Sequence, residues 1–336
     1  MAREGRSHVR KRKKGCLVGC LTNLLLVLGV AALLFVGVHV LGFVKSDPQT
    51  GAPTLRFDNL PEIKLGDFDL SKIELPDVSK LTEKLPKWAY GVNPNGLTIK
   101  TLRAGDGEAV FVCADGYTML VGAGSGTGAA LCGQLLLCGV NHLSAAVAMG
   151  SEDEQLGAMK LALGMTKPDY LFVPPTQTKG KAYAQMIDAA EKRGTQIVSA
   201  TQNMAFTLGR ARVTFIGPAR TQHTDSRDDG LTLRIDYGET SAVVTGCITA
   251  SGEKEIVASG AAVKCDALIA SRGGSEAATC TEWVEAAKPG VALVTGKNPA
   301  NSVRIRLQKA GATVYAAKEN GVMTLYSDGQ KITVQP

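Results

Sequence analysis

The chain shows one long apolar run, followed by a region in which short apolar segments alternate with polar ones. Residues 15–44 contain no Asp, Glu, Lys or Arg, and a helix needs roughly 20 apolar residues to cross a bilayer. Residues 1–14 contain seven Lys or Arg and one acid. The positive-inside rule therefore predicts a basic cytoplasmic tail at 1–14, a transmembrane helix at 15–44 and an extracellular or periplasmic remainder. No small-residue cleavage site follows the run, so we expect an uncleaved single-pass anchor in a bacterial cell membrane.

Residues 45–95 differ in composition from the rest of the chain. Prolines recur through this segment, which argues against a continuous helix. Apolar and charged residues alternate in Ile63-Lys-Leu65 and in Phe68-Asp-Leu70, and a period of two is typical of extended backbone. We predict an extended stalk that spaces the following domain from the membrane, with a disordered linker as the alternative.

From residue 96 to residue 336 the pattern alternates between short apolar runs, typical of buried strands, and segments with helical spacing. The predicted strands are 97–102, 109–113, 118–121, 145–148, 170–173, 196–199, 212–216, 231–237, 242–245, 267–270, 291–294, 314–316, 323–326 and 331–334. The predicted helices are 128–138, 152–163, 182–193, 252–260, 281–287 and 303–310. A domain of this length with this order of elements is typical of a layered α/β architecture.

The distribution of charge along the chain indicates which partners to expect. The formal net charge is +6, and all of it lies in residues 1–14, so the remainder of the chain is neutral. A nucleic-acid surface normally carries a basic excess or a basic stripe, and the sequence predicts neither. The expected partners are the membrane, through residues 15–44, and an extracytoplasmic protein or ligand.

Six cysteines lie outside the predicted membrane span: Cys113, Cys132, Cys138, Cys247, Cys265 and Cys280. An exported domain with an even number of cysteines permits disulfides. Several of these cysteines lie within apolar runs, so buried thiols are the other reading. No CxxC spacing is present, so the cysteines do not predict a zinc site.

Five stretches in order along residues 97–336 resemble one known family. They are Gly105-Asp-Gly-Glu-Ala109, Leu120-Val-Gly-Ala-Gly124, Leu231 to Gly238 followed by Ala242 to Cys247, Ala267 to Ser275, and Gly311 to Gly329. Together they resemble the metallo-β-lactamase fold, and most closely the C-terminal hydrolase domain of ComEC-type competence proteins. The resemblance implies an α/β fold, a metallo-β-lactamase-like αββα sandwich over residues 96–336, with a di-metal hydrolytic centre.

The departures from the family pattern all fall on the metal centre. The positions that match the family's ligands, and the glycine and serine beside them, are Gly122, Gly150, Glu152, Glu154, Gln155, Cys247, Arg272, Gly273 and Ser275. Zinc is held by imidazole, thiolate or carboxylate, and Gly, Gln and Arg supply none of these. The sequence therefore predicts a pseudoenzyme without catalytic residues or metal, whose former cleft serves as a binding or scaffolding surface.

Three alternatives remain open in this region. Glu152, Asp153 and Glu154 could hold Mg²⁺ or Ca²⁺, which would give a divergent hydrolase or nuclease related to competence DNA uptake. Against this, Ser151 and Glu154 have the spacing of a capping box at a helix start. The glycine-rich segment 122–128 is expected to be a tight turn rather than a phosphate site. Cys247, with Arg272 predicted across the cleft, is a candidate reactive thiol.

Overall fold

The computed structural model describes residues 92–105, 107–126, 128–176, 180–295 and 298–335. The predicted tail, the predicted transmembrane helix and all but the last few residues of the predicted stalk lie outside these ranges. Within them, no helix is long and apolar enough to cross a membrane. The predictions for residues 1–91 therefore stay predictions.

The first sheet has eight strands in the order β15-β14-β1-β2-β3-β4-β5-β6. Its strands are β1 (Leu97–Thr101), β2 (Val110–Ala114), β3 (Tyr117–Val121), β4 (Ala145–Val147), β5 (Tyr170–Val173), β6 (Gln196–Ser199), β14 (Thr324–Ser327) and β15 (Ile332–Gln335). Neighbours from β3 to β6 are parallel, whereas β1, β2, β14 and β15 pair antiparallel. The β2–β3 turn is Asp115-Gly116, with φ of 51° and 88°, as a two-residue hairpin turn with two left-handed positions requires.

The second sheet has seven strands in the order β13-β12-β11-β10-β9-β8-β7. Its strands are β7 (Ala205–Leu208), β8 (Ala211–Gly217), β9 (Thr232–Tyr237), β10 (Thr240–Val244), β11 (Ala267–Ile269), β12 (Val291–Val294) and β13 (Thr313–Ala316). Strands β10 to β13 are parallel, and hairpins join β7, β8, β9 and β10. In both sheets, then, a parallel half adjoins an antiparallel half.

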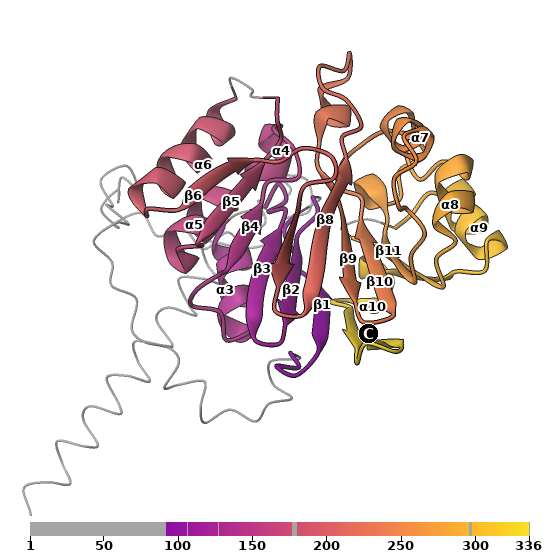
Figure 1. Ribbon diagram of the computed structural model, residues 1–336, viewed down its shortest axis with the longest axis horizontal. Coiled ribbons are helices and arrows are strands. Elements are labelled where there is room, and N and C mark those ends of the chain that lie inside the picture. The colour runs from indigo at the N-terminus through magenta and orange to yellow at the C-terminus, as the bar shows by residue number, and fades with distance from the viewer. Residues whose placement is uncertain (1–91, 106, 127, 177–179, 296–297, 336) are drawn as a thin grey trace, which may run out of the picture. The chain divides into compact units, whose positions relative to one another are not determined.

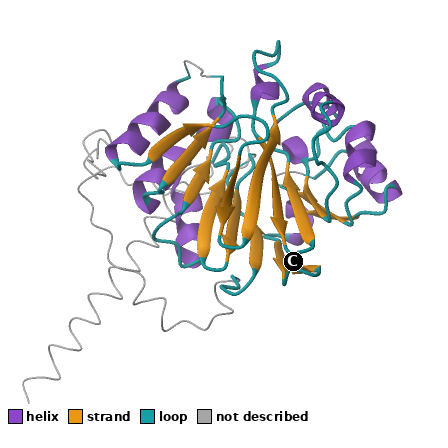
Figure 2. Ribbon diagram, viewed as in Figure 1, coloured by secondary structure: helices purple, strands orange, loops and turns teal. Residues whose placement is uncertain are grey.

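Four layers follow from the packing of the core. One apolar cluster contains residues of both sheets, such as Val112 and Phe215, and fills the space between them. A second cluster covers the outer face of the first sheet, beneath α3 (Gly128–Leu137), α5 (Met159–Thr166) and α6 (Lys181–Lys192). A third covers the outer face of the second sheet, beneath α7 (Ala250–Ala258), α8 (Thr281–Ala287) and α9 (Asn301–Lys309). The predicted α/β sandwich is confirmed, with helices on both outer faces (Figures 1 and 2).

Burial on both faces explains why many strands read as continuous apolar runs. All five residues of β2, Val-Phe-Val-Cys-Ala, are buried, because one face contacts the opposite sheet and the other contacts helices. The short strand β7 was not predicted. Its residues are mostly half-buried or exposed, so its apolar pattern is weak.

The predicted helix over 152–163 is wrong as a single element. The structure divides this segment into α4 (Asp153–Leu156) and α5, with Gly157 and Ala158 between them. The backbone of Gly124 forms a β-bridge with Leu156 at this point. This contact fixes the end of α4 against the turn that follows β3, a long-range constraint that local periodicity does not carry.

Candidate functional site

The predicted cleft residues follow the carboxyl ends of neighbouring strands. Gly122 follows β3 and Gly150 follows β4, while Cys247 follows β10 and Arg272 follows β11. Each pair of strands is parallel, so their carboxyl ends lie at one edge of their sheet. The two pairs of ends meet at the side chain of Met149, which the structure places beside Gly122 and Gly246. The predicted cleft residues of both sheets therefore lie at one edge of the sandwich.

Met149 occupies the centre of this edge. A Cβ atom on Gly246 would lie 2.8 Å from Met149 Cε, and one on Gly122 would lie 3.7 Å from Met149 Cγ. The side chain is buried, and the carbonyl oxygen of Met149 accepts a 2.8 Å hydrogen bond from the backbone N–H of Leu231. The apolar side chain of Met149 therefore lies beside a glycine of each of the two sheets.

Gln155 fills the place that a side chain at position 150 would take. A Cβ atom on Gly150 would lie only 1.6 Å from Gln155 Oε1 and 2.7 Å from its Cδ. Within the described part of the chain, Gln155 Oε1 is buried without a hydrogen-bond partner. A ligand side chain at position 150 is incompatible with this position of the Gln155 carboxamide.

The acidic segment forms a short helix start. Helix α4 begins at Asp153, and its N-cap Glu152 makes no side-chain cap hydrogen bond. The helix thus starts one residue later than the capping box led by Ser151 predicts, and the box itself stays a prediction. The carboxylate of Glu152 instead accepts a 2.5 Å hydrogen bond from the Ser226 hydroxyl. The side chains of Asp153 and Glu154 lie outside what the structure describes, so a cation at this segment stays a hypothesis.

Arg272 contacts Gly246, the residue directly before Cys247. The backbone N–H of Arg272 donates a 3.0 Å hydrogen bond to the Gly246 carbonyl oxygen, and Arg272 has a left-handed φ of 48°. Cys247 is half-buried. The same loop continues through Gly273, also left-handed, to Ser275, whose hydroxyl accepts a 3.4 Å hydrogen bond from the Ala277 N–H.

A buried carboxylate on α7 accepts hydrogen bonds from the loop that contains Arg272. Glu253, on α7, accepts hydrogen bonds of 2.7 Å from the backbone N–H groups of Thr279 and Cys280. It also accepts a 2.5 Å bond from the Ser271 hydroxyl. Burial raises the pKa of Glu253, and these donors partly offset that rise. Sequence reasoning did not identify Glu253, because its position on an amphipathic helix resembles that of any surface acid.

His223 is held between two carboxylates. Its Nδ1 lies 2.7 Å from Asp229 Oδ1, and its Nε2 lies 2.8 Å from Glu255 Oε2. Burial alone would lower the pKa of His223, but the bonds to Asp229 and Glu255 raise it above its ordinary value. Two carboxylate acceptors favour the doubly protonated ring. This cluster fastens the loop after β8 to α7, and Arg220 also pairs with Glu255.

Glu108, in the first motif of the family resemblance, is a buried acid. Its carboxylate oxygens have no hydrogen-bond partner among the described residues, and burial raises its pKa well above the ordinary value. The backbone oxygen of Glu108 would lie 2.5 Å from a Cβ atom on Gly122. The backbone of this motif therefore packs directly against the first candidate cleft position.

The glycine-rich segment after β3 forms a tight turn that packs against another backbone segment, as the sequence predicts. A Cβ atom on Gly124 would lie 2.1 Å from the Ala104 carbonyl oxygen, and one on Gly107 would lie 2.4 Å from Gly124 Cα. The N–H of Gly126 donates a 2.9 Å hydrogen bond to the same Ala104 oxygen. Glycine is required here because two backbone segments approach each other without room for side chains.

The residues at this edge do not fit the di-metal centre of the resembled family. Most of the positions that would supply ligands carry Gly, Gln or Arg, and Glu152, Glu154 and Cys247 are the only ones with a carboxylate or a thiol. Gln155 lies beside Gly150, and Met149 lies beside Gly122 and Gly246. No cluster of three His, Cys, Asp or Glu suited to a metal ion occurs in the part of the chain that the structure describes.

The five buried cysteines are thiols. Burial raises their pKa, to about 12 for Cys132, Cys265 and Cys280.

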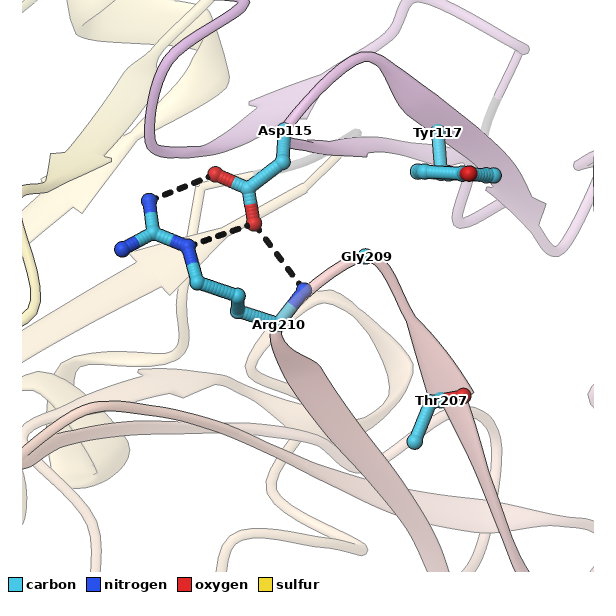
Figure 3. Close-up of a pocket in the computed structure, with 5 residues that line it drawn as sticks. All are labelled: Asp115, Tyr117, Thr207, Gly209 and Arg210. Atoms are coloured by element: carbon cyan, nitrogen blue, oxygen red, sulfur yellow. Dashed lines mark hydrogen bonds and ion pairs between the residues drawn. The ribbon is translucent and has the colours of Figure 1, made fainter.

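At the other end of the sandwich, a shallow pocket of about 580 Å³ lies between two hairpin turns. Arg210, from the β7–β8 turn, donates from Nη2 and Nε to the Asp115 carboxylate over 2.7 Å and 3.0 Å (Figure 3). The Tyr237 hydroxyl donates to the same carboxylate over 2.7 Å. The hydrogen bonds from Arg210 lower the pKa of Asp115 well below its usual range. This group joins the two sheets, so we interpret it as a structural link.

The chain is similar to hydrolases of the metallo-β-lactamase fold. It is 22% identical over 191 residues to ComE operon protein 3 of Bacillus subtilis strain 168, covering 55% of this chain and 25% of that protein. The metallo-β-lactamase-fold protein YhfI of Bacillus subtilis has 17% identity and a TM-score of 0.46, over 67% of this chain and 98% of YhfI. Igni18, a metallo hydrolase from Ignicoccus hospitalis, has 15% identity and a TM-score of 0.42, over 71% and 99%. No family model matches the chain.

The chain spans about a quarter of the length of the curated relative that it matches. Identities this low concern the fold, and they assign neither activity nor partner to this chain. A functional conclusion therefore has to come from the residues at the edge described above.

Proposed function

We propose that this chain is a membrane-anchored, extracytoplasmic module that keeps a metallo-β-lactamase fold and uses it for binding or scaffolding rather than hydrolysis. The observation that carries the proposal is the filled edge of the sandwich. Gln155 Oε1 lies where a Cβ atom at position 150 would be, and Met149 lies between the ends of β3 and β10. A ligand side chain at position 150 would thus require the Gln155 carboxamide to move, which supports the proposal.

The chemistry of the donor set supports the same conclusion. A metal-bound water becomes acidic near neutral pH only when protein ligands hold the metal. Glycine, glutamine and arginine occupy most of the matched positions and provide no such ligands, and only Glu152, Glu154 and Cys247 could. Two charged groups remain at this edge. One is Arg272, whose loop is hydrogen-bonded to the Glu253 carboxylate. The other is Glu152, which is hydrogen-bonded to Ser226. A charged, well-supported rim of this kind suits recognition of another molecule.

The proposed location rests on the sequence of residues 1–44. A basic segment followed by an uncharged run supports an anchor with the folded domain outside the cytoplasm. We propose a protein partner in the envelope or outside the cell, because residues 45–336 carry no net charge and so provide no general attraction for nucleic acid.

Site-specific photocrosslinking tests the binding surface. A photoreactive amino acid replaces Arg272, at the proposed surface, or Tyr117, which is 57% exposed beside the Asp115 link at the opposite end. In cells that produce the chain, we expect a discrete adduct from position 272 and none from position 117. Equal adducts from both positions, or none from 272, would contradict the proposal.

A hydrolysis assay tests the alternative, a divergent metal-dependent hydrolase or nuclease with Mg²⁺ or Ca²⁺ at Glu152, Asp153 and Glu154. The purified chain is incubated with single-stranded DNA and with a model phosphodiester in the presence of each ion. We expect no turnover above a protein-free control. Cation-dependent cleavage that Glu152→Gln abolishes and Glu191→Gln leaves intact would establish the alternative instead.

A further inference from the structure

A second pocket lies beside the candidate cleft, and its chemistry differs from that of the cleft. It has a volume of about 430 Å³, within the range of small-molecule sites. Its lining combines the segment after β1, the carboxyl end of β12 and the segment around α10 (Ala317–Asn320). The lining residues are Thr101, Leu102, Arg103, Gly105, Thr295, Ala317, Lys318, Gly321 and Val322. None of them belongs to the predicted cleft.

Two cations line this pocket without compensation. Arg103 and Lys318 come from different segments of the lining, and both residues are exposed. Neither has an ion-pair partner among the described residues, and no acid is among the described residues that line the pocket. By contrast, Arg304 nearby pairs with Glu319 at 2.5 Å. Like charges that line one pocket repel each other, and an anion bound near both would offset that repulsion.

The walls that carry these cations are held in place. The N–H of Arg103 donates to Gln134 Oε1 over 2.8 Å, and Gln134 Nε2 donates back to the Arg103 carbonyl oxygen over 2.7 Å. The neighbouring Thr101 exchanges hydrogen bonds of 3.0 Å with the backbone of Met323. A site whose backbone is already fixed loses less entropy when it binds a ligand.

The guanidinium of Arg103 extends across the pocket. Its Nη2 lies 3.8 Å from the place of a Cβ atom on Gly321, on the wall that carries Lys318. Gly321 has a φ of 76°, a conformation that favours glycine. No side chain therefore projects from this position toward the Arg103 guanidinium. The segment that carries Lys318 and Gly321 also contributes the half-buried apolar residues Ala317 and Val322 to the lining.

We propose that this pocket binds a small organic phosphate, with the phosphate between Arg103 and Lys318 and the organic part against Ala317 and Val322. A guanidinium matches phosphate oxygens with two parallel hydrogen bonds, and an ammonium adds a point charge. Two cations suit a dianion better than a single carboxylate. The inference is independent of the proposed loss of hydrolysis, because no residue of the candidate cleft takes part.

Titration calorimetry of the purified chain in neutral detergent tests this site. The probes are phenyl phosphate, inorganic phosphate and, as a separate source of the same group, vesicles that contain phosphatidylglycerol. We expect saturable binding of phenyl phosphate, tighter than that of inorganic phosphate because the ring covers apolar surface. Arg103→Gln and Lys318→Gln should each weaken it by about tenfold or more.

Matched variants separate a specific site from general surface charge. Arg212→Gln and Lys160→Gln remove exposed cations from β8 and α5, and both should bind phenyl phosphate as the unaltered chain does. The proposal is overturned if no saturable binding occurs at millimolar phenyl phosphate, or if the control variants weaken binding equally. Binding to vesicles but not to phenyl phosphate would also overturn it, since a membrane surface would then be the ligand. Unchanged circular dichroism of each variant confirms that it is folded.

Discussion

Replacement of Glu108 by Met should stabilise the protein at neutral pH. The Glu108 side chain is 5% exposed, and its carboxylate has no hydrogen-bond partner among the described residues. Burial raises its pKa well above the ordinary value, so the folded state favours the neutral acid. Methionine has a similar length, fits irregular apolar surroundings and has no ionisable group.

The magnitude follows from proton linkage. Unfolded Glu has a pKa of about 4.3, and each pH unit over which the folded carboxyl is kept neutral costs about 1.36 kcal/mol. The ceiling at pH 7 is therefore about 3.7 kcal/mol. Because the folded pKa is raised, the folded state binds more protons, and the stability of the unaltered protein falls as pH rises above the unfolded pKa. The advantage of Glu108→Met should grow by up to about 1.4 kcal/mol per pH unit between pH 5 and pH 7.

Urea unfolding at several pH values, followed by tryptophan fluorescence to which the buried Trp283 contributes, measures this advantage. Glu191→Met removes an exposed acid from α6 and should show no such pH-dependent gain. The prediction is wrong if the Glu108→Met protein is less stable than the unaltered protein at pH 7, or if the difference in stability does not change with pH. A loss at pH 7 would mean that the carboxylate has a partner, such as a bound cation.

Three further predictions concern the links that hold the loops and the two sheets. Asp115→Asn should cost about 1 kcal/mol at pH 7, because Arg210 is largely exposed; since the folded pKa of Asp115 is depressed, the deficit in urea unfolding should shrink as pH falls below about 4. Glu253→Gln should cost about 3 kcal/mol, because it places an N–H₂ donor against backbone donors, and amide exchange at Cys280 should accelerate. His223→Gln should destabilise the protein more at pH 6 than at pH 9, because the raised pKa of His223 contributes stability that is lost as pH rises through its folded value; an equal deficit at both pH values would contradict this.

Much of the fold could be predicted because burial on both sheet faces leaves a strong local signal. Strands such as Tyr170–Val173 and Val291–Val294, and the helix Thr281–Ala287, have the predicted bounds. Strand β7 lacked that signal because much of its surface is exposed or half-buried. The division between α4 and α5 depends on the bridge from Gly124 to Leu156, a contact that no local pattern reveals.

The candidate site was only partly predictable, for a related reason. The order of motifs placed Gly122, Gly150, Cys247 and Arg272 after strands whose ends meet, and topology alone brings them to one edge. What fills that edge depends on side-chain packing across the sandwich. Met149 gave no chemical signal as an apolar residue at a strand end. The sequence also did not predict the buried carboxylates or the hydrogen bonds of His223 to Asp229 and Glu255, because it does not show which acids are buried.

We propose that this edge of the fold does not hold a metal centre, and the metal content of the purified chain tests this proposal. The chain is produced with zinc, manganese and calcium supplied, purified in neutral detergent without chelators, and examined by elemental analysis. We expect less than a tenth of an equivalent of each metal, about the level of adventitious binding. One or two equivalents of a metal per chain, reduced by Glu152→Gln but not by Glu191→Gln, would contradict the account and identify the acidic segment as a metal site.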